Sequence, residues 1–436
     1  MGYTHAIPIE VAPAGWVARR RQVARIVSAV LVAALCIDYG GGIGLKYLGI
    51  FLALAWIMTR RSTVDIWRRH WKDFVVLLIL PTGLALVHLA RALMFDPGFD
   101  TRNFIVRYYN TLSTPALLFL IPLIYFAGSN AVARQISIGF RYVSIVLIAL
   151  LALHVSGIIN INDYWDFAQR YELGRLGLDP RLQGHDVSQS GQYSLRIGFS
   201  MPLVFGYELA TSAMGAALMF MGFLVIGSRG LVLGAIVIAA LWFLRGHTKR
   251  GVMWRLLLAL GLAIALLVFS APLRFRLTEV FVHRSAGILA GSDYTTLIRL
   301  GHIKGYADMI AADPWKIFVG AGPTGYIINP VWKAILGYGE VAITELSILN
   351  VAIYYGVPYA ILFAYWLFRS ASRLWKLRHH PDFEPADAGL IIGATIFWIT
   401  GNINPQMLAP FSMIAFMLLT VRRDELLTRE SADSVE

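Results

Sequence analysis

Long apolar runs are the feature of this sequence that most restricts its fold. Two of them are Leu256–Ala271 and Ala352–Phe368. Runs that approach about 20 residues match the hydrocarbon thickness of a bilayer, whereas a soluble protein would divide its apolar residues into amphipathic stripes. The composition agrees, since 57% of the residues are hydrophobic and 15% are charged. We therefore expect an all-α polytopic membrane protein, with residues 1–436 forming a single integral membrane domain.

The N-terminal segment and the cysteine content bear on processing and compartment. The single cysteine, Cys36, lies inside an apolar run, so an intrachain disulfide is impossible and a packing role is expected. The first residues, MGYTHAIPIEVAPAGWVARRRQ, contain no small-residue cleavage site after an apolar run. We expect no removable signal peptide, and the first spanning helix should direct insertion.

Charge alternation orients the first five apolar segments. These segments cover about 22–38, 43–59, 74–94, 109–127 and 139–159. Basic clusters at Arg19–Arg25 and Arg60–Lys72, and more weakly at Arg134 and Arg141, alternate with charge-poor turns such as Asp38–Gly44. Because basic residues favour the cytoplasmic side, the N-terminus is predicted to be cytoplasmic. The fifth helix then leads into an outer loop, residues 160–196.

A lone arginine, Arg229, lies between the next apolar runs. The apolar stretch from Ile197 to Leu244 is too long for one crossing and ends at the basic cluster Arg245–Arg255, so three short helices are predicted, at about 197–211, 213–228 and 230–245. Parity then places the turn Gly227–Gly230 on the outer face. A guanidinium inside hydrocarbon costs roughly 2.5 to 3.5 kcal/mol. At the outer surface Arg229 either meets an anionic ligand or snorkels at a helix end.

The remaining segments complete about twelve helices with both termini in the cytoplasm. A ninth helix covers about 252–270, a long outer loop covers 271–341, and a tenth helix covers about 343–368 before the basic segment Arg369–His380. A final hairpin of helices at about 388–402 and 406–421 has its outer tip at Gly401–Gln406. We expect the loop 271–341 to be partly helical.

The long outer loop contains an amphipathic helical pattern between Asp293 and Asp313. Its apolar residues recur at spacings of three and four: Leu297, Leu300, Ile303, Ala307 and Ile310. Asp293 would cap the helix, and Pro314 lies beyond its end. The opposite face holds Thr295, Arg299, His302 and Tyr306. This face is expected to be exposed; it is either simply solvated or positions Arg299 to share a diphosphate with Arg229, because arginine binds phosphate in a bidentate manner.

Two features follow this helix. The stretch DPWKIFVGAGPTGY, Asp313–Tyr326, resembles a phosphate loop in its glycines, but no Gly-Lys-Ser/Thr follows and no strand precedes it, so a tight turn is expected. Glu345 lies in the first turn of the tenth helix. It either favours the helix N-terminus electrostatically or acts as a general base, since partial burial raises the pKa of a carboxyl group.

The order of these motifs resembles the O-antigen ligase and polymerase superfamily. A Ser-Arg-Gly, Ser228–Gly230, ends a helix at the outer face. An arginine-bearing loop helix follows, and then the turn PWKIFVGAG. The next helix contains a glycine, Gly356, eleven residues after Glu345. The resemblance covers roughly residues 196–358. It implies a GT-C-like glycosyltransferase fold and action outside the inner membrane on glycans carried by undecaprenyl diphosphate, with inversion and without a metal or other cofactor.

The resemblance also implies roles for individual residues. Arg229 and Arg299 match the two family arginines that hold the diphosphate leaving group. Ligases carry a His-Asn pair where this chain has Glu345 and Leu346, and an acid followed by a hydroxyl, here Glu345 and Ser347, is more similar to the Wzy-type polymerases. Glu345 is then the expected base, and polymerase is favoured over ligase. The expected substrate-binding residues are Arg196, Ser228, His302, Lys304, Tyr306 and Ser347.

Other classes of protein fit the sequence less well. A metal-dependent glycosyltransferase would need an Asp-x-Asp pair, and the nearest acidic residues, Asp163 and Asp166, have the wrong spacing. A lipid-linked glycan transporter would need charged residues along a central path, and the few candidates are His88, His154 and Glu208. The expected partners are lipid-linked donor and acceptor glycans and membrane lipid, with a chain-length regulator and a flippase, and no nucleic acid. The expected location is the bacterial inner membrane, with the active site in the periplasm.

Overall fold

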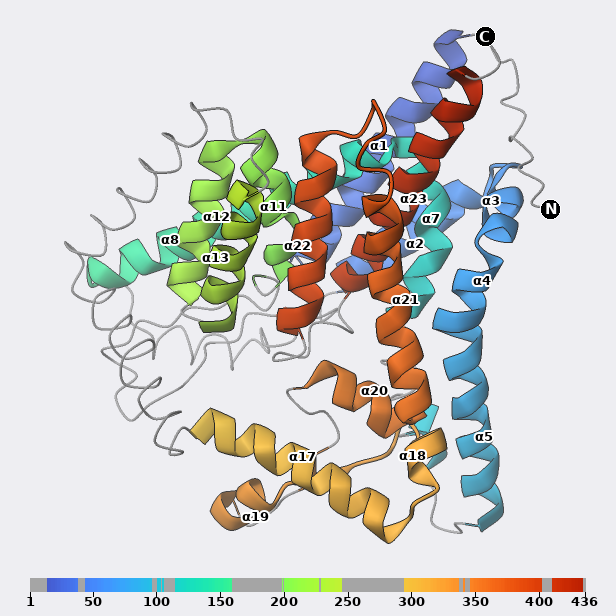
Figure 1. Cartoon of the computed structure of the whole chain (residues 1–436), viewed down its shortest axis with the longest axis vertical. Coiled ribbons are helices and arrows are strands. Elements are labelled where there is room, and N and C mark those ends of the chain that lie inside the picture. Colours follow the sequence, from blue (N-terminus) through green and yellow to red (C-terminus); the bar gives the residue numbers. More distant parts are fainter. Residues whose placement is uncertain are drawn as a thin grey trace.

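The computed structural model describes most of the chain, and its architecture is helical (Figure 1). The described residues are 14–37, 44–95, 100–102, 104–105, 114–158, 198, 200–226, 229–244, 294–336, 340–341, 346–401 and 410–433. The one pair of strands in them is β1 (Ile327–Ile328), antiparallel to β2 (Glu340–Val341). The expected all-α class is confirmed. The predicted loop 160–196, the ninth helix and residues 271–293 of the long loop lie outside the described residues.

The helices fall into three groups along the chain. The first is α1 (Ala14–Ile37), α2 (Leu45–Met58), α3 (Thr63–Arg69), α4 (Trp71–Phe74), the π-helical turn η1 (Val75–Ile79) and α5 (Leu80–Phe95). The second is the 3₁₀ turn η2 (Pro115–Leu120), α7 (Ile121–Ala127), α8 (Ser129–Val155), α11 (Pro202–Thr211), α12 (Ala213–Ile226) and α13 (Arg229–Leu244). The third is α17 (Tyr294–Ala312), α18 (Lys316–Val319), α19 (Pro330–Leu336), α20 (Ser347–Tyr355), α21 (Val357–Trp375), α22 (Pro385–Gly401) and α23 (Pro410–Asp433).

Two of the described helices are long and apolar enough to cross a membrane. They cover Trp71–Phe95 and Ser129–Leu150. Five shorter apolar helices cover Leu45–Met58, Pro115–Ala127, Ala213–Ile226, Gly230–Leu244 and Pro385–Thr400. The number of twelve crossings therefore stays a prediction.

The prediction of three short helices between the polar loop and the basic cluster is confirmed by α11, α12 and α13. The helices α11 and α22 pack closely together, because glycines let the two backbones touch. A Cβ atom built on Gly206 would lie 2.2 Å from the Gly389 carbonyl oxygen, and one on Gly393 would lie 2.4 Å from the Leu203 carbonyl oxygen. Gly389 and Gly393 form a Gly-x-x-x-Gly pair, which is typical of helix packing inside membranes.

One end of the helical bundle, the polar end, collects buried charged groups. His70 lies 3.0 Å from an Asp73 carboxylate oxygen and 2.8 Å from the Tyr125 hydroxyl, which donates to Asp424 at 2.5 Å. Trp366 of α21 donates to Asp73 at 2.9 Å. Nearby, charged side chains pair from α22 and α23: Arg422 donates to both Asp387 carboxylate oxygens, at 2.7 and 2.9 Å. These bonds join the first and last parts of the chain.

The opposite end of the bundle, the loop end, carries α17, α18, α19 and α20 (Figure 1). The last turns of α5 reach this group: His88 Nε2 lies 2.7 Å from the Val319 carbonyl oxygen, and Arg91 lies 4.0 Å from Asp313. The start of α13 lies at this end too. Gly234 packs beside Thr400, at the end of α22 far from the Asp387–Arg422 pair. The described residues of the predicted loop 271–341 and the start of α13 therefore lie at one end of the fold.

The tenth helix, predicted as one helix over about 343–368, is broken into α20 and α21 at Gly356. Gly356 has φ 88° and ψ 162°, a conformation that is essentially restricted to glycine. A Cβ atom there would lie 2.2 Å from the Phe318 carbonyl oxygen. Because the end of α18 packs directly against this backbone, the helix cannot continue, and α20 runs at an angle to α21 (Figure 1). The prediction of a continuous helix is wrong.

The amphipathic helix of the long loop is present as α17, but its buried face differs from the prediction. Leu300 and Ile303 are 56% and 52% exposed, whereas Ile298 is 5% exposed and His302 is fully buried. The reason is backbone packing, because the buried face also carries two glycines that admit another segment of the chain. The polar face that the sequence indicates to be exposed is therefore buried at His302 and half-buried at Arg299 and Tyr306.

We expect Gly356→Ala to lower the free energy of unfolding by about 1 to 3 kcal/mol, because alanine must adopt a conformation that only glycine tolerates. Contact with the Phe318 carbonyl would add to this cost. Denaturant unfolding of the purified protein in detergent measures the change. The matched control is Gly83→Ala in α5, where a Cβ atom meets nothing within 4 Å, so that stability should stay equal or rise by up to about 1 kcal/mol. Equal stability of the two variants would contradict a fixed break at Gly356.

Candidate functional site

The turn Val319–Gly322 stands at the centre of the loop end. Ala321 donates its backbone N–H to the Ile353 carbonyl at 2.6 Å, and Gly322 donates to the Tyr354 carbonyl at 3.2 Å. These two carbonyl groups belong to the last turn of α20, where carbonyl oxygens have no hydrogen-bond donor within the helix. The expectation of a tight turn is confirmed. The two N–H groups are used within the protein and are not available to a phosphate.

The turn is also held from its other side by α5. Because a carbonyl oxygen only accepts hydrogen bonds, the ring of His88 donates from Nε2 to Val319. A Cβ atom on Gly322, which has φ 82°, would lie 2.9 Å from the His88 ring. His88 was a candidate for a polar path through the membrane. Its observed contact instead fixes the turn to the end of α5.

The helix α17 is fixed to the segment that follows the turn. Gly301 and Gly305 lie so close to this segment that added Cβ atoms would stand 2.2 Å from the Asn329 side-chain oxygen and from the Ile328 carbonyl oxygen. The buried Asn329 donates to the Ile298 carbonyl at 3.0 Å and accepts from Val331 N–H at 2.9 Å. These contacts set which face of α17 is buried.

Asn329 was not among the residues predicted from the sequence. It directly precedes Pro330, the first residue of α19, and asparagine before a proline is a strong signal for a helix start. That signal predicts the short helix and its cap. It does not predict the second bond of Asn329, to α17, which depends on the tertiary fold.

His302 lies on the buried face of α17, one turn after Arg299. Its removal from water, and secondly the positive charge of Arg299, lower the pKa of His302 to about 4. The imidazole is therefore neutral at pH 7 and adds no positive charge for an anionic ligand. Arg299 itself is half-buried.

Tyr306 continues the same face, one turn beyond His302. Its hydroxyl oxygen is buried and has no hydrogen-bond partner among the residues that the structure describes. Burial raises the pKa of Tyr306, so the group stays protonated and can donate. Lys304 points away from this face and is exposed. Arg299, His302 and Tyr306 therefore form a row along α17, as their spacing predicts.

The other predicted site residues are described only in part. Arg229 is the first residue of α13, and its backbone lies at the loop end, but nothing is described of its side chain. Ser347 begins α20 and is fully buried. Arg196, Ser228 and Glu345 lie outside the described residues. The structure therefore tests neither the convergence of Arg229 with Arg299 nor the place of Glu345.

A strong charge pair away from this region was also not predicted. Arg141 of α8 donates to both carboxylate oxygens of Glu208 in α11, at 2.7 Å each, and Ser137 donates to the same carboxylate. Glu208 is fully buried. A bidentate arginine satisfies such a carboxylate, so Glu208 is a structural group that joins two helices.

No group of three or more His, Cys, Asp or Glu side chains suited to a metal ion occurs within the described part of the chain. The charged groups at the loop end are mainly basic, and they suit an anion better than a cation. In comparisons with known proteins, no family model and no curated protein matches this chain.

Truncation of Tyr306 and of Asn329 should change the free energy of unfolding differently. Tyr306→Phe should leave the free energy of unfolding unchanged or raise it, because it removes a buried hydroxyl that costs about 1 to 3 kcal/mol when unpaired. Asn329→Ala should lower it by about 1 to 3 kcal/mol, because two hydrogen bonds are lost. Denaturant unfolding measures both. An equal loss in Tyr306→Phe would mean that the hydroxyl has a partner elsewhere in the chain.

Proposed function

We propose that this protein polymerises oligosaccharide repeat units linked to undecaprenyl diphosphate, by metal-independent, inverting glycosyl transfer at the periplasmic face of the inner membrane. The proposal includes a GT-C-like arrangement of about twelve membrane-spanning helices with both termini in the cytoplasm. The observation that carries it is the joint between the turn Val319–Gly322 and the break at Gly356. This joint brings together two of the motifs, the turn and the helix with Gly356, whose order resembles the O-antigen ligase and polymerase superfamily.

The placement of elements at the loop end supports a common site. The helix α21 starts at this end beside α20, and a short link joins its far end to α22, so α22 ends back at the loop end. The start of α13, at Arg229, packs near the last turn of α22. The backbone of Arg229 and the helix that carries Arg299 are therefore at the same end of the bundle, as a shared diphosphate site requires.

The proposed reaction requires the protein to remove a proton from the acceptor hydroxyl and to stabilise the departing diphosphate. A hydroxyl of the acceptor sugar attacks the anomeric carbon of the donor; the new C–O bond forms as the bond to the diphosphate breaks. Glu345 takes the hydroxyl proton. Arg229 and Arg299 hold the departing diphosphate and stabilise the negative charge that grows on it.

The described residues refine the supporting roles. His302 is buried and neutral at pH 7, so it is assigned no charge-stabilising role. Lys304 is exposed and adds positive charge on the outer side of α17. The buried hydroxyl of Tyr306 has no hydrogen-bond partner among the described residues, and we assign it a hydrogen bond to the glycan or diphosphate.

Two of the side chains that a transporter would need along a polar path are bonded within the protein. Glu208 is paired with Arg141, and His88 is bonded to the Val319 carbonyl. Neither is available to line a polar path in this state. His154 lies in α8, and nothing is described of its side chain.

We expect Arg299→Lys and Arg229→Lys each to abolish most polymerisation while the protein still inserts and folds, because lysine keeps the charge but loses the planar fork of donors. The readout is the ladder of polymer lengths in a strain without its own copy of the gene. The matched control is Lys333→Arg in α19, which keeps an exposed charge outside the proposed binding residues and should leave the ladder intact. A normal ladder with either arginine replaced would mean that this arginine only anchors a helix. The glycans of a strain that lacks this protein distinguish the two enzymes. Lipid A core that carries a single repeat unit would indicate a polymerase, and lipid A core that carries none would indicate a ligase.

We expect Glu345→Gln to reduce the rate of glycan extension by about 10²- to 10⁴-fold, because it removes the proton acceptor but keeps the size of the side chain. Extension of a lipid-linked repeat unit by the purified protein measures the rate. A structural role at the helix N-terminus would instead change stability by about 0.3 to 1 kcal/mol and leave the rate within a few-fold of wild type. That second result would remove Glu345 from the mechanism.

A further inference from the structure

The side of α17 that faces away from β1 and α19 is apolar. Leu300 and Ile303 are 56% and 52% exposed, and two exposed alanines follow them at helical spacing. These four residues are called the outer face of α17: Leu300, Ile303, Ala307 and Ala311. Two exposed charged residues, Lys304 and Asp308, lie along one edge of this face. The helix therefore presents a row of apolar side chains, with charge at its border, to its surroundings.

The opposite side of α17 is occupied by the protein itself. Gly301 and Gly305 lie against Asn329 and Ile328, and His302 between them is fully buried. The helix thus buries an imidazole and exposes a leucine and an isoleucine, which is the reverse of the usual pattern of a surface helix in water. Exposed apolar surface of this kind marks a contact with another protein or with a membrane.

Two exposed aromatic side chains follow the outer face along the chain. Trp315 directly precedes α18 and Phe318 lies within it, and their rings are 5.6 Å apart. The two residues are 61% and 57% exposed. Tryptophan is enriched where a membrane meets water, because its ring is apolar and its N–H is polar. The aromatic pair is therefore suited to the same surroundings as the outer face.

These groups adjoin the end of a helix that is long and apolar enough to cross a membrane. Arg91 of α5 lies 4.0 Å from Asp313, which comes between α17 and α18. The last residues of α5 expose large apolar side chains: Leu93, Met94 and Phe95. The helix α5 is part of the candidate span Trp71–Phe95. The apolar surface of this span therefore ends beside α18 and the last turn of α17.

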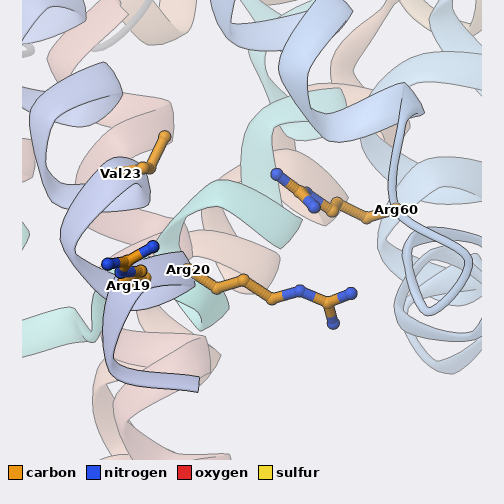
Figure 2. A pocket seen from close by; sticks show the side chains of 4 residues that line it. All are labelled: Arg19, Arg20, Val23 and Arg60. Carbon is orange, nitrogen blue, oxygen red and sulfur yellow. The ribbon is translucent and has the colours of Figure 1, made fainter. Parts of the chain in front are cut away.

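The opposite end of the bundle indicates which leaflet the loop end meets. Arg19 and Arg20 of α1 and Arg60, which follows α2, line a space of about 200 Å³ together with Val23. Figure 2 shows Arg20 and Arg60 extending into this space from opposite sides. Basic residues beside spanning helices are typical of the cytoplasmic side. The loop end then meets the outer leaflet.

We propose that the outer face of α17, with Trp315 and Phe318, is a docking surface for the outer lipid leaflet. In Figure 1, α17 runs across the direction of α5, as a helix in the plane of a membrane does beside a spanning helix. Its apolar side chains would enter the boundary between headgroups and acyl chains by roughly 5 to 10 Å. Lipid is favoured over a second copy of the chain, because the adjoining surface of α5 is that of a candidate span.

Docking would also set the depth of the candidate site. Arg299 is half-buried on α17, beside the outer face, so it would lie at the level of the lipid phosphates. The diphosphate of a lipid-linked glycan lies at that level. The docking surface rests on the membrane location that the proposed function includes, and it does not rest on glycosyl transfer.

Spin labels on single cysteines of the full-length protein test the proposal, in a Cys36→Ala background and in vesicles of phosphatidylethanolamine and phosphatidylglycerol. Each label reports its collisions with oxygen, which concentrates among acyl chains, and with a nickel chelate, which stays in water. We expect the ratio of oxygen to nickel collisions to be several-fold higher at Ala307→Cys than at Ala334→Cys. Ala334 is the matched control, because it is an exposed alanine of α19, on the other side of α17.

A label at Val87→Cys, an exposed position of α5, separates the two ways in which the proposal can fail. A lipid-like ratio at Val87 with a water-like ratio at Ala307 overturns the docking surface alone. Water-like ratios at both positions overturn the membrane location. Few collisions with either reagent at Ala307 would mean that protein, such as a second copy of the chain, covers the outer face, and this also overturns the proposal. If Ala307→Cys does not fold, Ala311→Cys on the same face must give the lipid-like ratio.

Discussion

The close approach of two backbones, between the turn Val319–Gly322 and the end of α20, determines the arrangement of the whole loop end. Gly320 has φ 76° and ψ −169°, and a Cβ atom on it would lie 2.5 Å from the Tyr354 carbonyl carbon. Gly356 meets the same turn from the other side. Gly320 and Gly356, both in conformations that other residues rarely adopt, thus lie at this contact. The last carbonyl groups of α20 accept hydrogen bonds from the turn. Because α5 also bonds to this turn through His88, three distant parts of the chain meet at one point.

Much of the helical layout could be predicted, because it depends on run length and charge. The three short helices α11, α12 and α13 follow from an apolar stretch too long for one crossing, and their bounds agree with prediction within a few residues at each end. The break at Gly356 could not be predicted in this way. It lies within a continuous apolar run, and it exists because a segment more than 30 residues earlier packs against it.

The candidate site was predictable in its spacing and not in its burial. Arg299, His302 and Tyr306 share a face of α17, as helical periodicity requires. Burial on α17 does not follow the apolar residues, because Gly301 and Gly305 contribute almost nothing to hydrophobicity and yet allow another segment of the backbone to approach.

The bonds at the polar end have a consequence for the order of assembly. Tyr125 lies in the first third of the chain, and Asp424, which accepts its hydrogen bond, comes 299 residues later. During synthesis from the N-terminus, α7 must therefore exist for most of the elongation time with this hydroxyl bonded to water or to a temporary partner. Arg422 and Asp387 likewise pair only when α23 has emerged. The C-terminal helix is thus the closing element of the fold, and a chain truncated before α23 would leave the polar groups of its N-terminal helices without their final partners.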